Sequence, residues 1–137
     1  MRIMAIDYGD AHTGVAISDP TGFLAGYAAT IDAYRPEVVA DRVAALAREY
    51  GVEELVLGYP KNMDGSLGPR AEKSEAMAIL LREVTALPVT LWDERRTTID
   101  AHQILFAGGK NAKQRKKTVD AVAASLILEG YLTFKKN

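Results

Sequence analysis

The sequence predicts an α/β fold: a mixed five-stranded sheet, with three antiparallel strands followed by two parallel ones, and helices on both faces. Two observations favour this architecture. Three apolar segments near the N-terminus are separated only by short turns, which is typical of an antiparallel meander. Further along the chain, helical repeats alternate with two short apolar runs. Right-handed crossovers would make those two strands parallel to the first one.

The predicted meander begins with two apolar runs, residues 3–6 and 15–17, which flank a polar turn that contains Gly9. We expect a β-hairpin here, with Asp7 at the end of its first strand. A third strand is predicted over residues 23–30. An aspartate at a strand end can start a turn by bonding its own backbone, or it can bind a metal ion. This stretch alone favours neither interpretation.

The rest of the chain predicts helices in alternation with two strands. Helices are expected over residues 36–50, 70–84, about 98–106 and about 118–131, and strands over 55–57 and 88–92. Parallel strands end at the same edge of a sheet, so Asp7, Tyr59 and Glu94 are predicted to share one edge.

Composition indicates an ordinary globular protein. We expect the 137 residues to form a single domain, 1–137, which is long enough for one core. Fractions of 48% hydrophobic and 26% charged residues are usual for soluble proteins. The sequence has no cysteine, which excludes disulfides and thiolate metal sites, and no apolar run that could span a bilayer. Its start lacks the layout of a signal peptide, so we expect a cytoplasmic protein without membrane partners.

Three acidic residues from separate segments are predicted to meet at the shared edge. Asp7 ends the first strand, Glu94 follows the fifth, and Asp120 lies near the apolar stripe of the last helix. A carboxylate near a core costs several kcal/mol unless it is paired or binds a metal. Mg²⁺ prefers carboxylate oxygens, and two such ions can activate water for phosphodiester hydrolysis. Each acid alone is explained better by a cap or a salt bridge, but the three together favour a catalytic metal site.

A cationic segment follows Glu94. From residue 95 to residue 117 there is one acid, Asp100, and seven basic residues. These are Arg95, Arg96, Lys110, Lys113, Arg115, Lys116 and Lys117. Such clusters bind phosphate backbones, although a charge run is more often a solvated face. The position next to the predicted acids favours nucleic acid, and we expect residues 110–117 to be a loop that is mobile without a ligand.

Four sequence blocks occur in the order of one known family: DYGDAHTGVAISD at 7–19, LGYPKNMDGS at 57–66, DERRTT at 93–98 and KTVDAVAA at 117–124. Together they resemble the YqgF/RuvX family, whose members have an RNase H-like fold and are described as pre-16S rRNA nucleases or Holliday junction resolvases. The resemblance implies that Asp7, Glu94 and Asp120 are the catalytic, metal-binding acids, with Mg²⁺, or alternatively Mn²⁺, as the ion. It implies a metal-dependent endonuclease that acts on structured nucleic acid, in 5′-end processing of pre-16S rRNA, Holliday junction resolution, or both. The choice between pre-rRNA and branched DNA, and between monomer and homodimer, stays open at this point.

The chain departs from the family pattern at two places. The first block usually reads Asp-x-Gly-x-x-Arg-x-Gly, and here His12 replaces the arginine. Related RuvC-type resolvases carry an acid at the end of the fourth strand, where this chain has Gly58, Tyr59 and Pro60. Glu94 must then substitute from one strand further out. Because neighbouring strands lie about 4.8 Å apart, its backbone is expected roughly 10 Å from that of Asp7.

Two other classes of protein share parts of this pattern. Actin-like ATP-binding kinases have the sheet and an Asp-x-Gly phosphate loop, but they need a second domain, for which 137 residues are too few. A non-catalytic RNA- or DNA-binding module would keep the fold and the basic segment without the metal chemistry. The isolated His12 and His102 fit no zinc site.

Overall fold

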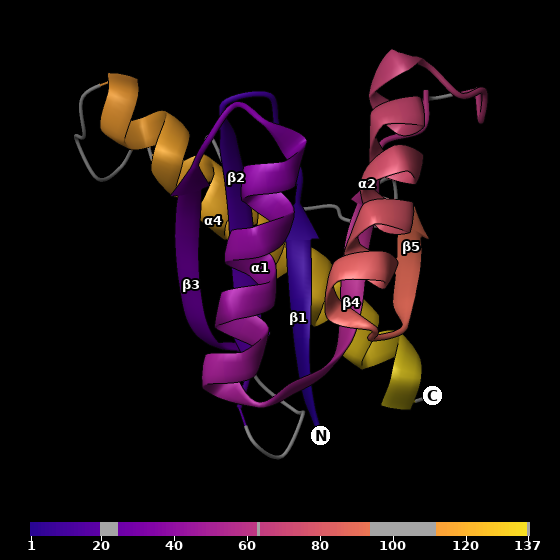
Figure 1. The fold of residues 1–137 in the computed structure, drawn as a ribbon. Helices are drawn as coiled ribbons and strands as arrows, with labels where there is room; N and C mark the ends of the chain where they lie inside the picture. Colours follow the sequence, from indigo (N-terminus) through magenta and orange to yellow (C-terminus); the bar gives the residue numbers. More distant parts are fainter. Residues whose placement is uncertain (20–24, 63, 94–111, 137) are drawn as a thin grey trace.

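The computed structural model describes residues 1–19, 25–62, 64–93 and 112–136, which form a mixed five-stranded sheet with helices on both faces (Figure 1). The strands are β1 (Arg2–Asp7), β2 (His12–Ser18), β3 (Ala25–Asp32), β4 (Val52–Tyr59) and β5 (Val89–Asp93). The helices are α1 (Pro36–Tyr50), α2 (Pro69–Thr85) and α4 (Ala112–Lys136). The order of the strands across the sheet is β3-β2-β1-β4-β5.

Strand pairing follows the predicted topology. β2 pairs antiparallel with both β1 and β3, whereas β4 pairs parallel with both β1 and β5. The strands β1, β4 and β5 therefore end at one side of the sheet, which we call the carboxyl edge. Their last residues are Asp7, Tyr59 and Asp93. The predicted fold class, with three antiparallel strands followed by two parallel ones, is confirmed.

Side chains of β1 alternate between two hydrophobic cores, one on each face of the sheet. Met4 and Ile6 belong to the core that packs against α1 and α2, and Ile3 and Ala5 belong to the core under α4. Figure 1 shows α1 and α2 on one face, with α4 crossing the opposite face. Because successive residues of a strand point to opposite faces, this alternation decides on which face each residue at the carboxyl edge lies.

Helix α1 has the sequence signals that the prediction used. Pro36 lies in its first turn together with Glu37, and Gly51 ends the helix with a φ of 66°. This left-handed conformation favours glycine, and the Gly51 N–H donates to the Ala47 carbonyl oxygen. The helix predicted over 36–50 is confirmed.

Helix α4 is longer than its apolar repeat predicts. It covers Ala112–Lys136, whereas the repeat predicts residues 118–131, so the loop expected over 110–117 is wrong for residues 112–117. Lysine, glutamine and arginine have high helix propensity and continue the helix without an apolar stripe. The helix predicted near 98–106 lies outside the described residues. In the part of the chain that the structure describes, no helix has the length and apolar character needed to cross a bilayer.

Polar and aromatic contacts fix the C-terminal half of α4 to the sheet. The buried Glu54 of β4 accepts a hydrogen bond from the Tyr131 hydroxyl, and Lys135 Nζ lies 2.9 Å from its other carboxylate oxygen. Trp92 of β5 meets Tyr131 edge-on, with ring centroids 5.6 Å apart. Trp92 also lies against Gly130, where an added Cβ would be 3.4 Å from the indole. These contacts define the position of α4 across the sheet.

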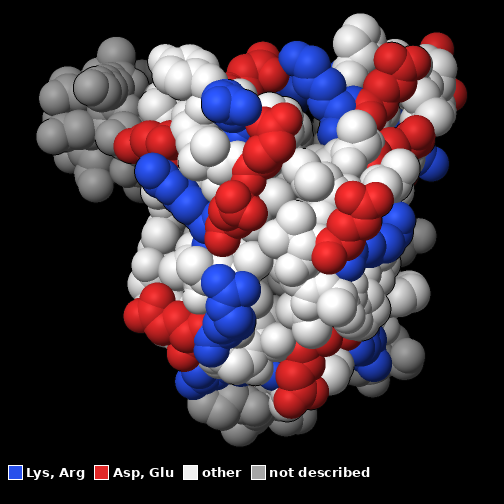
Figure 2. Space-filling view, viewed as in Figure 1, with Lys and Arg blue, Asp and Glu red and all other residues white. Residues whose placement is uncertain are grey.

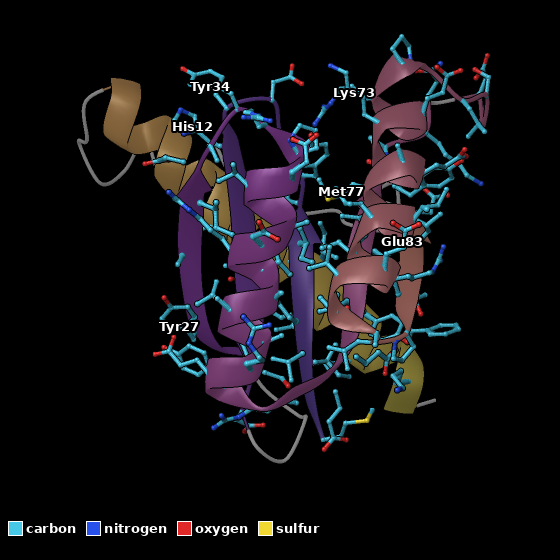
Figure 3. The ribbon with its side chains drawn as sticks, in the orientation of Figure 1. His12, Tyr27, Tyr34, Lys73, Met77 and Glu83 are labelled. Atoms are coloured by element: carbon cyan, nitrogen blue, oxygen red, sulfur yellow. The ribbon has the colours of Figure 1, made fainter. Side chains whose placement is uncertain are left out.

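Charged side chains of both signs are interspersed over the face formed by α1 and α2 (Figure 2). The formal net charge of the chain is −1, so attraction of an anion depends on local clusters of cations. His12 and Lys73 lie at the carboxyl edge, and Tyr27 lies at the opposite end of the sheet (Figure 3).

Candidate functional site at the carboxyl edge

Asp7 is half-buried at the end of β1. It pairs with Gly14 of β2, and it lies level with Gly58 of β4, since Ile6 pairs with Leu57. The alternation along β1 puts Asp7 on the face that α4 covers. Gly14 and Gly58 are both buried, and neither adds a side chain beside the Asp7 carboxylate. Such positions allow a ligand to approach the backbone closely.

The turn after Asp7 is closely packed and requires a glycine. A Cβ atom at Gly9 would lie 2.4 Å from the His12 carbonyl oxygen, well inside van der Waals contact. The Gly9 N–H points to the hydroxyl of the buried Thr13, with the nitrogen 3.4 Å from Oγ1. The turn therefore holds the end of β1 against the start of β2.

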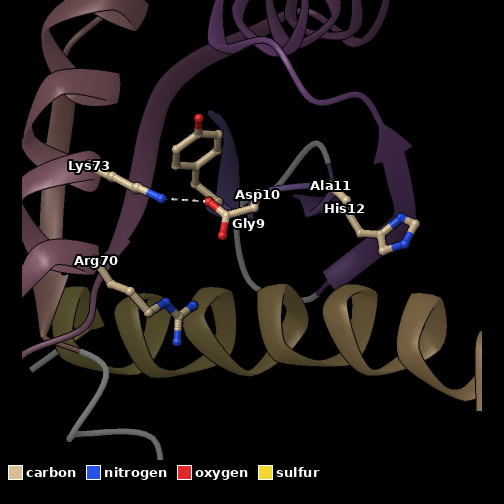
Figure 4. Close-up of a pocket in the computed structure, with 7 residues that line it drawn as sticks. Gly9, Asp10, Ala11, His12, Arg70 and Lys73 are labelled. Atoms are coloured by element: carbon tan, nitrogen blue, oxygen red, sulfur yellow. Dashed lines mark hydrogen bonds and ion pairs between the residues drawn. The ribbon is translucent and has the colours of Figure 1, made fainter.

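A cavity of about 240 Å³ opens between this turn and the first turns of α2 (Figure 4). It is lined by Tyr8, Gly9, Asp10, Ala11, His12, Arg70 and Lys73. Lys73 Nζ lies 2.9 Å from an Asp10 carboxylate oxygen, and this hydrogen bond raises the pKa of Lys73. Burial, followed by the negative charge of Asp10, raises the pKa of the Tyr8 hydroxyl. The cavity thus combines two permanent cations with one carboxylate.

His12, where the sequence departs from the family pattern, is paired across the sheet. Its Nδ1 lies 2.7 Å from Oδ1 of Asp32, and the two residues are register partners in β2 and β3. The pair joins the first residue of β2 to the last residue of β3 beside the cavity. His12 therefore has a structural partner that the sequence did not indicate.

Tyr59 and Asp93, at the ends of β4 and β5, are register partners and lie on the face opposite Asp7. Trp92 belongs to the core under α4, so the next residue, Asp93, points to the α1–α2 face. Tyr59 donates a hydrogen bond to Glu75 of α2, which, together with burial, raises the pKa of Tyr59 to about 12. The ammonium of Lys61 lies 5.6 Å from the centre of the Tyr59 ring.

Of the three predicted acids, Asp7 is the one whose side chain the structure describes. Glu94 lies outside the described residues, one position after the end of β5. Asp120 lies in α4, and position 120 precedes the core residues Ala124 and Ile127 by four and seven residues. This spacing puts position 120 on the helix face that packs on the sheet. The described residues contain no group of three or more side chains able to hold a metal ion.

The predicted basic residues fall into two groups. Arg95, Arg96 and Lys110 lie outside the described residues, and Lys113, Arg115, Lys116 and Lys117 lie in the first two turns of α4. Sequence reasoning missed Arg70 and Lys73, which line the cavity. The available signal was their spacing of three residues at the start of a helix that follows a glycine-containing loop.

A protein-family model described as "RuvX: Holliday junction resolvase" matches residues 1–134 of the chain. The chain belongs to the RuvX family. A protein of Halothermothrix orenii named "Putative pre-16S rRNA nuclease" is 46% identical over 135 residues, which cover 98% of this chain and 96% of that protein. A protein of the same name from Geobacillus kaustophilus is 46% identical over 138 residues, which cover 99% and 100%. The predicted family is confirmed.

Solved structures show the same fold at low sequence identity. Thermus thermophilus RuvC in complex with a Holliday junction substrate superposes with a TM-score of 0.65 at 14% identity, covering 98% of this chain and 96% of that one. A second structure of Thermus thermophilus RuvC has a TM-score of 0.60 at 14% identity, covering 98% and 97%. A ROK hexokinase from Thermus thermophilus has a TM-score of 0.50 at 20% identity, covering 71% of this chain but 36% of that one. The RNase H-like fold predicted for RuvX members is confirmed.

Proposed function

We propose that this RuvX member is a metal-dependent endonuclease that hydrolyses phosphodiester bonds in structured nucleic acid. Its substrates are the 5′ end of pre-16S rRNA, a Holliday junction, or both. Family membership and the names of the relatives support phosphodiester hydrolysis. The observation that carries the proposal is Asp7, a half-buried acid at the carboxyl edge between Gly14 and Gly58. In open α/β sheets, ligands bind outside the carboxyl ends of the strands.

Asp7, Glu94 and Asp120 are the proposed metal ligands. Asp7 lies on the face that α4 covers, and position 120 lies on the side of α4 that packs on this face. Glu94 follows Trp92 by two positions, so a strand continued to residue 94 would point it to the same face. Three carboxylates from separate elements fit a hard divalent cation such as Mg²⁺ or Mn²⁺. When bound, the ion would supply an activated water and neutralise charge at the scissile phosphate.

Other residues of the chain bind and orient the substrate. Gly14 and Gly58 add no side chain on either side of Asp7, which leaves the strand ends free of bulk from β2 and β4. The basic residues at positions 113–117 of α4, together with Arg95, Arg96 and Lys110, would bind the phosphate backbone. Binding that rests on such contacts weakens steeply as the salt concentration rises. A cytoplasmic location, and a monomeric or homodimeric state, remain predictions.

Cleavage of a branched DNA and of a pre-16S rRNA fragment, each in Mg²⁺ and in EDTA, tests the proposal. We expect cleavage of at least one substrate in Mg²⁺ only. Asp7→Asn, Glu94→Gln and Asp120→Asn should each reduce the rate by at least about 100-fold, since even groups that only support metal ligands contribute about 10–100-fold. Asp93→Asn is the matched control, because this acid directly precedes Glu94 in the chain and points to the α1–α2 face.

Three outcomes would count against these assignments. Folded protein that cleaves neither substrate would refute the nuclease proposal. Full activity of Glu94→Gln, or an equal loss in Asp93→Asn, would refute the choice of acids. Nucleic-acid binding without cleavage, unchanged by Asp7→Asn, would favour a non-catalytic binding module of the same fold.

A further inference from the structure

The cavity beside the turn after Asp7 contains two cations that have no part in the proposed metal site. Arg70 and Lys73 lie three residues apart on α2, so their side chains leave the helix on the same face, and both line the cavity. Figure 4 shows them extending from α2 on the same side as Asp10 and the turn. Both cations lie on α2, on one face of the sheet, whereas the basic residues of α4 lie on a helix that covers the opposite face (Figure 1).

The chemistry of the cavity fits an oxyanion. The Lys73–Asp10 ion pair has side chains 57% and 82% exposed, and pairs this exposed are weak and easily exchanged. Arg70 makes no ion pair with a carboxylate in the described part of the chain. A guanidinium binds phosphate through two parallel N–H bonds. The start of α2 adds its positive dipole end, of which Glu72 in the first turn of the helix offsets a part.

The position of the cavity indicates which oxyanion it binds. Tyr8 and Gly9, which line it, follow Asp7 directly in the chain, so an anion bound there lies next to the proposed catalytic acid. A phosphodiester group of a nucleic-acid strand is an oxyanion, and a strand held at this cavity would continue to the carboxyl edge, where Asp7 lies.

We infer that Arg70 and Lys73 form a phosphate subsite for the substrate backbone, on the α1–α2 face of the sheet, so that the strand crosses the carboxyl edge beside Asp7. The inference rests on the proposed function in that the substrate is nucleic acid. Asp10 is the internal competitor of this subsite: the phosphate displaces its carboxylate from Lys73. The subsite and the basic residues of α4 then hold the strand from opposite faces, with Asp7 between them.

The test measures binding in EDTA, where the strand stays intact, by fluorescence anisotropy of a labelled branched DNA and a labelled single-stranded RNA. The variants are Arg70→Gln with Lys73→Gln, Asp10→Asn, and the matched control Arg48→Gln. Arg48 is an exposed cation in the last turn of α1, at the other end of the sheet. A salt slope of about 0.9 per phosphate contact on duplex DNA, or about 0.7 on a single strand, means that each lost contact weakens binding about eightfold or about fivefold at ~0.1 M salt, relative to ~1 M salt.

We expect the double variant to lose, per cation at ~0.1 M salt, about eightfold in affinity for the branched DNA and about fivefold for the RNA. It should have a shallower salt slope and approach wild type near ~1 M salt. Asp10→Asn should bind more tightly than wild type, and Arg48→Gln should bind like wild type. Circular dichroism verifies that each variant is folded. Wild-type affinity and slope in the double variant, an equal loss in Arg48→Gln, or no binding of either probe by wild type would overturn the inference. Normal binding without cleavage in Mg²⁺ would instead refute the nuclease proposal and leave the subsite standing.

Discussion

Replacing Gly9 by alanine perturbs the turn that follows Asp7 without changing any charge. The added Cβ atom would lie 2.4 Å from the His12 carbonyl oxygen, whereas ordinary contacts of this kind begin at 3.4 Å. The Cβ atom and the carbonyl oxygen must therefore move apart by the difference, 3.4 − 2.4 Å, or about 1 Å. The neighbour is a backbone atom, which cannot rotate away as the end of a side chain would. Gly9 does not have a positive φ, so its backbone conformation does not disfavour alanine. The cost of the substitution is therefore steric.

The expected magnitude follows from this displacement. Forcing one extra methyl group into a packed site costs about 1–3 kcal/mol. For a chain of this size, a loss of about 2 kcal/mol lowers Tm by about 6–10 °C. A shift of about 1 Å next to Asp7 should also reduce cleavage by about 100-fold, because catalysis depends strongly on the positions of the reacting groups. Activity should thus fall more than the small loss of folded protein explains.

Differential scanning calorimetry, and cleavage rates measured well below Tm, check this prediction. Gly26→Ala is the matched control, since the same substitution in β3 places the Cβ 3.5 Å from its nearest neighbour, an ordinary contact. We expect this control to change the unfolding free energy by less than about 0.5 kcal/mol. If Gly9→Ala melts and cleaves like the control, the close approach of Gly9 and His12 does not hold the site, and the reasoning is refuted.

Two further predictions concern titratable groups that join the helices to the sheet. Glu54→Gln should lower the unfolding free energy in urea by about 1–2 kcal/mol near neutral pH, after allowance for the partial exposure of Lys135. Tyr131 and Lys135 both have raised pKa values, Tyr131 mainly through burial and Lys135 mainly through its hydrogen bond to Glu54. The folded state therefore keeps these protons longer than the unfolded state, and this stabilisation falls as pH rises above their ordinary values of 10.0 and 10.5. The stability difference between wild type and Glu54→Gln should shrink in that range, and a difference that does not change there would contradict the assignment. Separately, absorbance titration should show a tyrosine with a pKa of about 12 that disappears in Tyr59→Phe and moves toward 10.0 in Glu75→Gln. A titration curve that is the same in Glu75→Gln would exclude the Tyr59–Glu75 hydrogen bond as the cause.

The sequence predicted those parts of the fold that local patterns encode. The apolar runs identified the strands, and Pro36 and Gly51 marked the ends of α1. The third strand was predicted over 23–30, but β3 continues to Asp32, because Ile31 and Asp32 pair with Thr13 and His12. The end of this strand depends on its partner, which the local sequence does not contain.

The candidate site, like the fold, was predicted only in part from the sequence. Topology alone predicted that Asp7 ends a strand at a shared edge, because right-handed crossovers fix the direction of the parallel strands. Arg70 and Lys73 were missed because two single cations on a helix do not form a charge run. Their relation to the turn at Tyr8–His12 exists only after about sixty residues of chain have folded between them.

The packing of Trp92 decides that Asp93, the last residue of β5, does not share a face with Asp7. A slip of β5 by one residue would turn Asp93 to the Asp7 face, since side chains alternate with a period of two. The Trp92 indole meets Tyr131 at 5.6 Å between ring centroids, and it lies where Gly130 leaves space, so this register is fixed by contacts with α4. The same helix carries position 120 on the face that packs on the sheet. The docking of α4 therefore keeps Asp93 away from the Asp7 face and at the same time supplies the helix from which the proposed ligand Asp120 comes. Loosening this docking at Trp92, for example by Trp92→Leu, should impair cleavage in Mg²⁺, because the position of α4 sets the position of Asp120.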